Sequence, residues 1–395
     1  MTRTNALVVC AVAAVCLGAA SSVAFAQESQ LRGFRLQSWD ETLENTINYA
    51  WNTARNTARV ATLNAVTINM CWASDKNDLV RDPAVVEGFQ KIRGNEKVTI
   101  NFPHDSSGTL LGSGDIMTRW EMGKLDCSTV SPDASIVGLG SSKWDSAKHT
   151  MYASSMIIAV VNPQAAEVLG KFFHKDPKEL NFVDLVSVAG KNWAELAPGN
   201  AEVANWGTVK GHATDCVRSA SCQVASAALA YSASGRANMT GRELSDPKVK
   251  SVIDTFRDKL DHTEASTARL TQKCFRNPVE CDFFFTYESQ IPEVENQIPG
   301  AIVVYNDRVI QADQVVAVTT YSPQRREAAL RFIDHIMSPP IQKLIAEKYG
   351  FRPGTVVDVQ GPVQKLKLMR LGIVHNPNPI LAKAVLASVT TPIAR

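Results

Sequence analysis

The stretch Lys97–Trp120, KVTINFPHDSSGTLLGSGDIMTRW, contains the strand, loop and helix pattern that decides the fold. Its alternating start, Val-Thr-Ile-Asn-Phe, predicts a strand with at least one buried face. A polar loop with Ser106, Ser107 and Thr109 follows, and the apolar spacing beyond it predicts one or two helices interrupted at 112–114. A hydroxyl-rich loop at a helix start is typical of a cradle for an anion or polar ligand, because the first helical N–H groups lack intrahelical partners. The same side chains also fit a simple helix cap, so both interpretations stay open.

A second strand and a helix precede this stretch. Residues 65–71 predict a core strand, the loop after it carries Ser74, and residues 85–92 predict a helix. Strand, helix, strand, loop and helix in that order are typical of a doubly wound parallel α/β sheet. In such sheets ligands bind outside the carboxyl ends of the strands. We therefore expect the Ser74 loop and the Ser106–Ser107 loop at the same edge of the sheet.

The N-terminus indicates export. Residues 1–26 combine Arg3, an apolar run and Ala24-Phe25-Ala26, which together predict a cleaved signal peptide. We expect a soluble, periplasmic mature protein from about Gln27. A capping-box pattern and helical apolar spacing predict one amphipathic helix over residues 38–60.

The charges and cysteines exclude some classes of protein. Lys and Arg number 41 against 39 Asp and Glu, so nothing indicates binding to nucleic acid or an acidic membrane surface. Past the signal peptide the chain has an even number of cysteines, which in an exported protein favours disulfides. Fifteen pairings are possible; close spacing favours Cys216–Cys222 and Cys274–Cys281, which leaves Cys71–Cys127. A metal site of His212, Cys216 and Cys222 lacks the paired short spacings of a zinc module, and we expect no metal and no cofactor.

Five segments carry a family resemblance. In the last of them Ser322-Pro323 and Ser338-Pro339 predict two helix starts, and Gly350 a helix end. The segments are Val98–Leu110, Tyr152–Val161, Phe285–Ser289, Gly300–Tyr305 and Ser322–Pro353. With these pieces in this order, the chain resembles a type II periplasmic solute-binding protein of an ABC transporter. It is most similar to the molybdate/sulfate-like branch and to related proteins of undefined substrate.

The resemblance implies an α/β fold of two lobes joined by two hinge crossovers. Lobe 1 would comprise residues 27–157, with the N-terminal helix as an extension, and the return segment 305–395. Lobe 2 would comprise residues 158–304, where the pattern predicts helices over 224–234 and 247–260. A monomer is the expected state.

The resemblance also implies ligand contacts from both lobes and the hinge. A carboxylate that faces the cleft repels an anion, so an inward Glu288 would favour a cationic or polyhydroxylated ligand. His212 or Thr214 would supply a donor from the opposite lobe, although a solvated loop histidine is the commoner case. Trp72, Trp144 and Trp206 fit either stacking on an organic ligand or ordinary anchors of a core. The implied contacts are Ser74, Ser106, Ser107, Thr109, Ser154, Ser155, Tyr287 and Glu288.

Two functions fit this sequence, and catalysis is not one of them. The chain has no nucleophile elbow, zinc motif or phosphate-binding loop, and the neighbours His104, Asp105 and Ser106 are too close in sequence to form a triad. We therefore expect no enzyme but a periplasmic receptor that captures a small solute, with oxyanions as one class, and delivers it to an inner-membrane ABC permease. The alternative is a sensory or protein-interaction module on the same two-lobe fold. In that case the helix at 38–60 and the tail at 359–395 would be partner surfaces.

Overall fold

The computed structural model describes residues 65–131, 148–354, 372–375 and 387–390, apart from positions 107, 237, 238, 240, 307 and 321. Contacts divide the chain into two compact units, 1–60 and 61–395, and every described residue belongs to the second. The predictions for the signal peptide, the helix at 38–60, Ser107, Trp144 and most of the tail fall outside the described residues.

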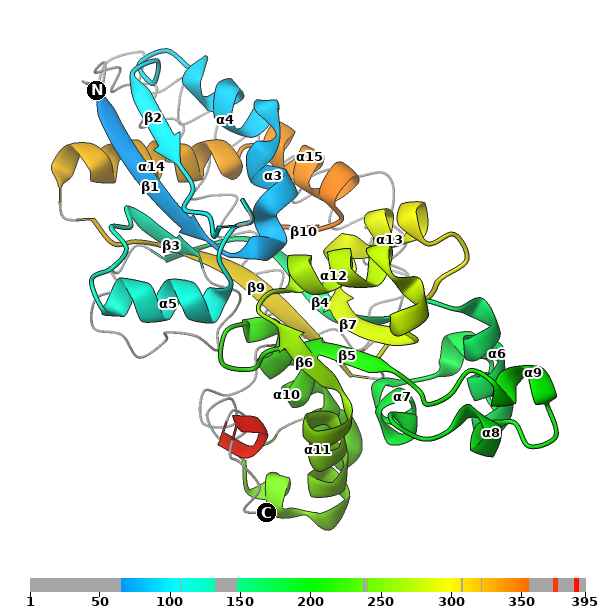
Figure 1. Ribbon diagram of the computed structural model, residues 1–395. Helices are drawn as coiled ribbons and strands as arrows, with labels where there is room; N and C mark the ends of the chain where they lie inside the picture. The colour runs from blue at the N-terminus through cyan, green and yellow to red at the C-terminus, as the bar shows by residue number, and fades with distance from the viewer. Residues whose placement is uncertain are drawn as a thin grey trace, which may run out of the picture. The chain divides into compact units, whose positions relative to one another are not determined.

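The described strands form one hydrogen-bonded network with the order β2-β1-β3-β9-β4-β7-β5-β6 (Figure 1). β8 and β10 also pair with β4, and β11 pairs with β9. The strands are β1 (Val66–Trp72), β2 (Val98–Asn101), β3 (Thr129–Ser131), β4 (Lys148–Val160), β5 (Gly211–Thr214), β6 (Asp261–Glu264), β7 (Phe283–Tyr287), β8 (Ile302–Tyr305), β9 (Arg308–Val318), β10 (Arg352–Pro353) and β11 (Gly372–His375).

Helices connect these strands. The α-helices are α3 (Asn77–Arg81), α4 (Pro83–Gln90), α5 (Ser113–Glu121), α6 (Pro163–Phe173), α7 (Phe182–Val188), α8 (Trp193–Leu196), α9 (Ala201–Ala204), α10 (Ala220–Ser234), α11 (Pro247–Lys259), α12 (Thr267–Arg276), α13 (Ile291–Gln297), α14 (Pro323–Ile336) and α15 (Pro339–Tyr349). Short 3-10 turns are η1 (Ser74–Lys76), η2 (Pro177–Glu179), η3 (Arg242–Ser245), η4 (Pro278–Glu280) and η5 (Glu288–Gln290). No helix in the described ranges is long and apolar enough to cross a membrane.

Strand β4 belongs to both halves of the network. Its first part, through Ser155, pairs antiparallel with β9, and its second part, from Met156, pairs with β7 and β8. β8 leads along the chain into β9, so two extended segments cross side by side between the halves (Figure 1). Parallel pairs β1–β2 and β1–β3 lie on one side of the crossing, and β5–β6 and β5–β7 on the other. This is the predicted two-lobe α/β fold with two crossovers.

Alternation along the strands builds a separate core for each lobe. In lobe 1, Cys71 packs with Ile116 and Trp120 of α5, whereas Trp72, on the other face of β1, packs on Phe332 of α14 at 5.7 Å between ring centroids. In lobe 2, the odd residues of β7 face the cluster that contains α7, α10 and α11. The even residue Phe284 packs with α12 and α13. Each of these buried aromatic side chains contributes about 1.5–3 kcal/mol relative to exposure.

Most predicted elements are present in the described ranges, one is shifted, and several elements of the structure were not predicted. The helix starts at Pro323 and Pro339 and the left-handed C-cap at Gly350 (φ 66°) are confirmed. The helix expected after the polar loop begins only at Ser113, because the loop closes on itself first. β3 and β9 were not predicted.

Candidate ligand-binding site

The loop after β1 places a buried ion pair at the boundary of the lobes. Ser74 is buried at the start of η1, at the carboxyl end of β1. Asp75 Oδ1 lies 2.9 Å from Lys76 Nζ, and both side chains are fully buried. α12 of lobe 2 contacts η1, so this pair lies where the lobes meet. Desolvating two charges is costly unless they compensate one another, and here they do.

The polar loop of lobe 1 is a closed turn and not a helix start. His104 and Leu110 form a β-bridge, and Gly108, at φ 75°, donates to the Asp105 carbonyl at 3.1 Å. The Asp105 carboxylate accepts a hydrogen bond from Thr109 N at 3.3 Å. Thr109 is therefore buried within the turn while Ser106 is exposed. The structure separates these hydroxyls from the N-terminus of α5, which the sequence had placed directly after them.

The two hinge serines point to opposite faces of β4, because neighbouring strand residues alternate. Ser154 Oγ accepts a hydrogen bond from Ser289 N at 3.3 Å. Tyr287 is directly opposite Met156 and lies in the core of lobe 2, on the face that Ser154 shares. Ser155 is fully buried on the other face, and its Oγ has no hydrogen-bond partner among the described residues.

Glu288 follows β7 and is compensated by an arginine from lobe 1. Its carboxylate accepts hydrogen bonds from Arg352 Nε at 2.6 Å and from Arg352 Nη2 at 3.0 Å, a bidentate geometry that favours strong pairing. The Glu288 side chain is fully buried. Burial opposes the charged guanidinium, but the Glu288 charge outweighs it and raises the pKa of Arg352. The Glu288 carboxylate is therefore buried, but its negative charge is balanced by Arg352. It does not by itself exclude an anionic ligand.

A tyrosine completes this hinge cluster. Tyr305 of β8 is opposite Ile157, on the face of β4 that Ser155 occupies, and Arg352 is opposite Ala153 on the same face. Burial, and secondarily the charge of Glu288, raise the pKa of Tyr305, so its phenol remains protonated. Within the described ranges its Oη has no hydrogen-bond partner. Sequence reasoning missed Arg352 and Tyr305, because only the strand register brings them beside Glu288.

The histidine, threonine and described tryptophans that the sequence suggested as ligand contacts have partners within their own lobes. His212 lies between Asp261 Oδ2 (3.2 Å) and the Glu280 carbonyl (2.6 Å). Thr214 Oγ1 is 2.7 Å from Ser221 Oγ. Trp206 packs edge-on against Trp193, and Trp72 is in the core of lobe 1. None of these contacts extends across the lobe boundary.

All six cysteines in the described ranges form disulfides in the favoured pairing, Cys71–Cys127, Cys216–Cys222 and Cys274–Cys281. The histidine beside Cys216 and Cys222 is His262 and not His212. Because the two sulfurs are joined to one another, they are not available as thiolate ligands in this structure.

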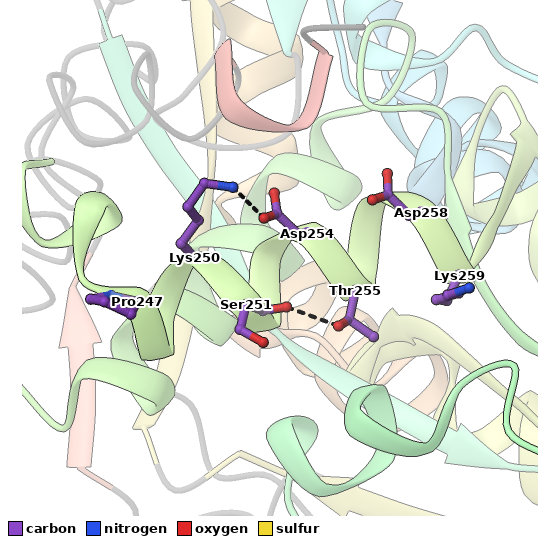
Figure 2. A pocket seen from close by; sticks show the side chains of 7 residues that line it. All are labelled: Pro247, Lys250, Ser251, Asp254, Thr255, Asp258 and Lys259. Atoms are coloured by element: carbon purple, nitrogen blue, oxygen red, sulfur yellow. Dashed lines mark hydrogen bonds and ion pairs between the residues drawn. The ribbon is translucent and has the colours of Figure 1, made fainter. Parts of the chain in front are cut away.

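A separate hollow of about 390 Å³ lies along α11 (Figure 2). Three of its charged lining residues take part in ion pairs: Lys250 with Asp254, and Asp258 with Arg257. Thr255 donates to the Ser251 carbonyl of the same helix at 2.8 Å. The hollow lies on the side of α11 opposite its buried residues Val249, Ile253 and Phe256, so we do not assign the solute to it. Its lining residues are Pro247, Lys250, Ser251, Asp254, Thr255, Asp258 and Lys259.

Comparison with known proteins decides the class. The sequence profile of the family described as bacterial extracellular solute-binding protein matches residues 84–352, which is well over half of the chain. The chain belongs to this family. The match covers the hinge strands and both members of the Glu288–Arg352 pair.

Solved structures of other solute-binding proteins share the fold. The sulfate-binding protein SubI from Mycobacterium tuberculosis H37Rv has a TM-score of 0.53 at 15% identity, covering 80% of this chain and 96% of that one. A substrate-binding protein of an ABC transporter from Agrobacterium tumefaciens has a TM-score of 0.54 at 12% identity, covering 82% and 94%. Maltose-bound MalE3 of T. maritima has a TM-score of 0.53 at 13% identity, covering 82% and 92%. The search of curated protein sequences found no match. At these identities the structures show the fold of the solute-binding protein, and not its ligand.

Among the described residues of this solute-binding protein, four ion pairs lie at the boundary of the lobes. The pairs are Asp75–Lys76, Asp105–Arg269, Asp115–Arg218 and Glu288–Arg352. A solute at the hinge would therefore contact hydroxyl groups and the remaining N–H groups of Arg352. The paired charges would leave little net electrostatic potential there. Such a surface can bind a polar solute by hydrogen bonds.

Proposed function

We propose that this protein is a periplasmic receptor that captures a small polar solute at the hinge and delivers it to an inner-membrane ABC permease. The observation that carries the proposal is the buried Ser155 hydroxyl, without a hydrogen-bond partner in the described part of the chain, at the point where β4 passes between the lobes. A buried polar group left unsatisfied costs about 1–3 kcal/mol, so such groups normally have a function or a partner. Ser289 Oγ and Tyr305 Oη are also buried without a hydrogen-bond partner among the described residues.

The proposal extends to the compartment and the ligand class. Export through a signal peptide at residues 1–26, a monomeric state, and lobes divided near residues 157 and 304 are part of it. Oxyanions are included among the solutes, because the Glu288 charge is compensated by Arg352. Neutral hydrogen-bond donors suffice for micromolar affinity, which needs only about 8 kcal/mol.

The test is a thermal-shift screen of the mature protein against oxyanions, sugars, amino acids, polyamines and organic acids. A solute at a hundred times its dissociation constant adds about 2.7 kcal/mol of stability and raises the melting temperature measurably. Ser155→Ala removes an unsatisfied hydroxyl, so the variant should melt at the wild-type temperature or slightly above it without solute. With the solute its shift should be smaller, because the dissociation constant rises about tenfold for each lost hydrogen bond.

Ser251→Ala is the matched control, because Ser251 is an exposed residue of α11. This variant should keep the full shift with the solute. No shift with any class of solute would contradict the proposal and favour an interaction module. An equal shift in wild type and Ser155→Ala would place the ligand elsewhere.

A further inference from the structure

The N-terminus of α5 is in contact with the main chain of lobe 2. α5 begins at Ser113, and its N-cap residue, Gly112, offers no side-chain acceptor. The N–H of Gly114, in the first turn, donates to the Arg218 carbonyl at 2.9 Å. The first N–H groups of a helix need an external acceptor. Here the opposite lobe supplies one.

Two glycines make this approach possible. A Cβ on Gly112 would lie 2.7 Å from the carbonyl oxygens of both Ala265 and Arg218, and a Cβ on Gly114 would lie 2.2 Å from the Val217 oxygen. Neither glycine has a positive φ, so the requirement is for space and not for an unusual backbone conformation. The two lobes therefore meet backbone to backbone at this point.

The loop of lobe 2 that meets α5, residues 215–219, is held by contacts within its own lobe. The Cys216–Cys222 disulfide joins it to the first turn of α10. The Asp215 carboxylate accepts hydrogen bonds from the N–H groups of Val217 (2.7 Å) and Arg218 (3.2 Å). Such a loop loses little conformational entropy when it docks.

The same contact includes an ion pair. Arg218 Nη2 lies 2.9 Å from Asp115 Oδ2, in the first turn of α5. Hydrogen bonding to Asp115 raises the pKa of Arg218. The Arg218 and Asp115 side chains are 46% and 21% exposed, so solvent weakens this pair. Residues 112–114, at the start of α5, are buried.

We infer that the N-terminus of α5 is the docking site for the Arg218 carbonyl, so that the helix end serves lobe closure and not anion binding. The N–H groups and dipole of α5 stabilise a closed arrangement of the two lobes that does not require a bound solute. An anion that used this helix end would have to displace the carbonyl. This assignment goes beyond the proposed transport function and holds whatever the solute is.

The experiment is Gly114→Ala in the full mature protein, measured without added solute. The new methyl group occupies the space of the Val217 carbonyl, so docking should be lost. We expect a larger radius of gyration by small-angle scattering and amide exchange at residues 112–118 faster by about tenfold, the effect of losing one hydrogen bond on a local opening equilibrium. Scattering and exchange unchanged from wild type would overturn the inference.

Two further variants make the test specific. Gly88→Ala in α4 is the matched control, because its Cβ meets its nearest neighbour, His335, at an ordinary 3.6 Å, and it should leave both measurements unchanged. Arg218→Ala keeps the main-chain carbonyl while it removes the ion pair, so the lobes should stay docked. Opening in Arg218→Ala as large as in Gly114→Ala would show that the ion pair, and not the carbonyl, holds the lobes. If Gly114→Ala does not fold, Gly112→Ala tests the same contact between the lobes. Its clash is milder, because the new Cβ would lie 2.7 Å from the Arg218 carbonyl oxygen.

Discussion

Replacing Arg352 with Met should destabilise the protein far more than breaking an ordinary ion pair. The Glu288 side chain is fully buried, and Arg352, itself only 21% exposed, compensates it through two hydrogen bonds. The variant keeps an apolar stem of similar length, so the main loss is the compensating charge. A buried carboxylate is then left without its partner.

The magnitude follows from the burial. Removing one partner of a buried pair costs about 3–5 kcal/mol, whereas exposed pairs contribute about 0–1 kcal/mol. Because the Arg352 side chain is partly accessible, water can reach the edge of the site, and we expect the lower end, about 3 kcal/mol. The free energy of unfolding is measured by urea titration followed by tryptophan fluorescence, with disulfides intact.

Two controls define the comparison. Lys91→Met breaks an (i, i+4) pair with Glu87, whose side chains are 77% and 60% exposed, and should cost less than about 1 kcal/mol. The double variant Glu288→Gln/Arg352→Met removes both charges and should be more stable than Arg352→Met alone. The reasoning is refuted if Arg352→Met costs no more than Lys91→Met.

Three further predictions concern stability and pH. Gly211→Ala should cost about 1–3 kcal/mol in urea titration, because its Cβ would lie 2.4 Å from a buried aromatic ring of β7; an unchanged midpoint would contradict this packing. Replacing both Cys71 and Cys127 with Ala should cost about 4 kcal/mol, given the sequence separation of 56, and a loss below about 1 kcal/mol would argue against the entropic account. Burial opposes ionisation of Asp261, but hydrogen bonds, chiefly from Lys273, outweigh it and lower its pKa from 3.8 to about 2. The resulting stabilisation is present above pH 3.8 and lost as the pH falls toward 2, so Lys273→Met should flatten the pH dependence of the urea midpoint in that window; a slope equal to wild type would refute the assignment.

Local signals predicted the elements whose formation depends on nearby residues. Proline at the first helical position and glycine beyond the last one mark α14 and α15 in the sequence, and the structure has both ends there. The apolar run of β4 is typical of a buried strand, because a strand buried on both faces lacks alternation, and its role as a crossover was implied by the family resemblance. Close spacing favoured one of the fifteen possible disulfide pairings, and the structure has that pairing.

The missed features depend on partners distant in sequence. β9 contains the polar residues Gln311, Asp313 and Gln314, and its pairing with β3 and β4 joins segments that are distant in sequence. Arg352 is 64 positions from Glu288, and no short-range pattern joins them. The helix start at Ser113 was misplaced because the turn at Asp105 uses the preceding donors first.

The antiparallel pairing of β3 with β9 sets the order in which the chain can complete its lobes. Thr129 pairs with Val318, so the sheet of lobe 1 lacks an inner strand until residue 318 has been synthesised and released. β5, β6 and β7 are all synthesised earlier and can pair among themselves. Contacts that span so much sequence form slowly. We therefore expect lobe 2 to fold first and β1 to β3 to wait with one sheet edge uncovered, which is the period when a folding chaperone would protect this protein most.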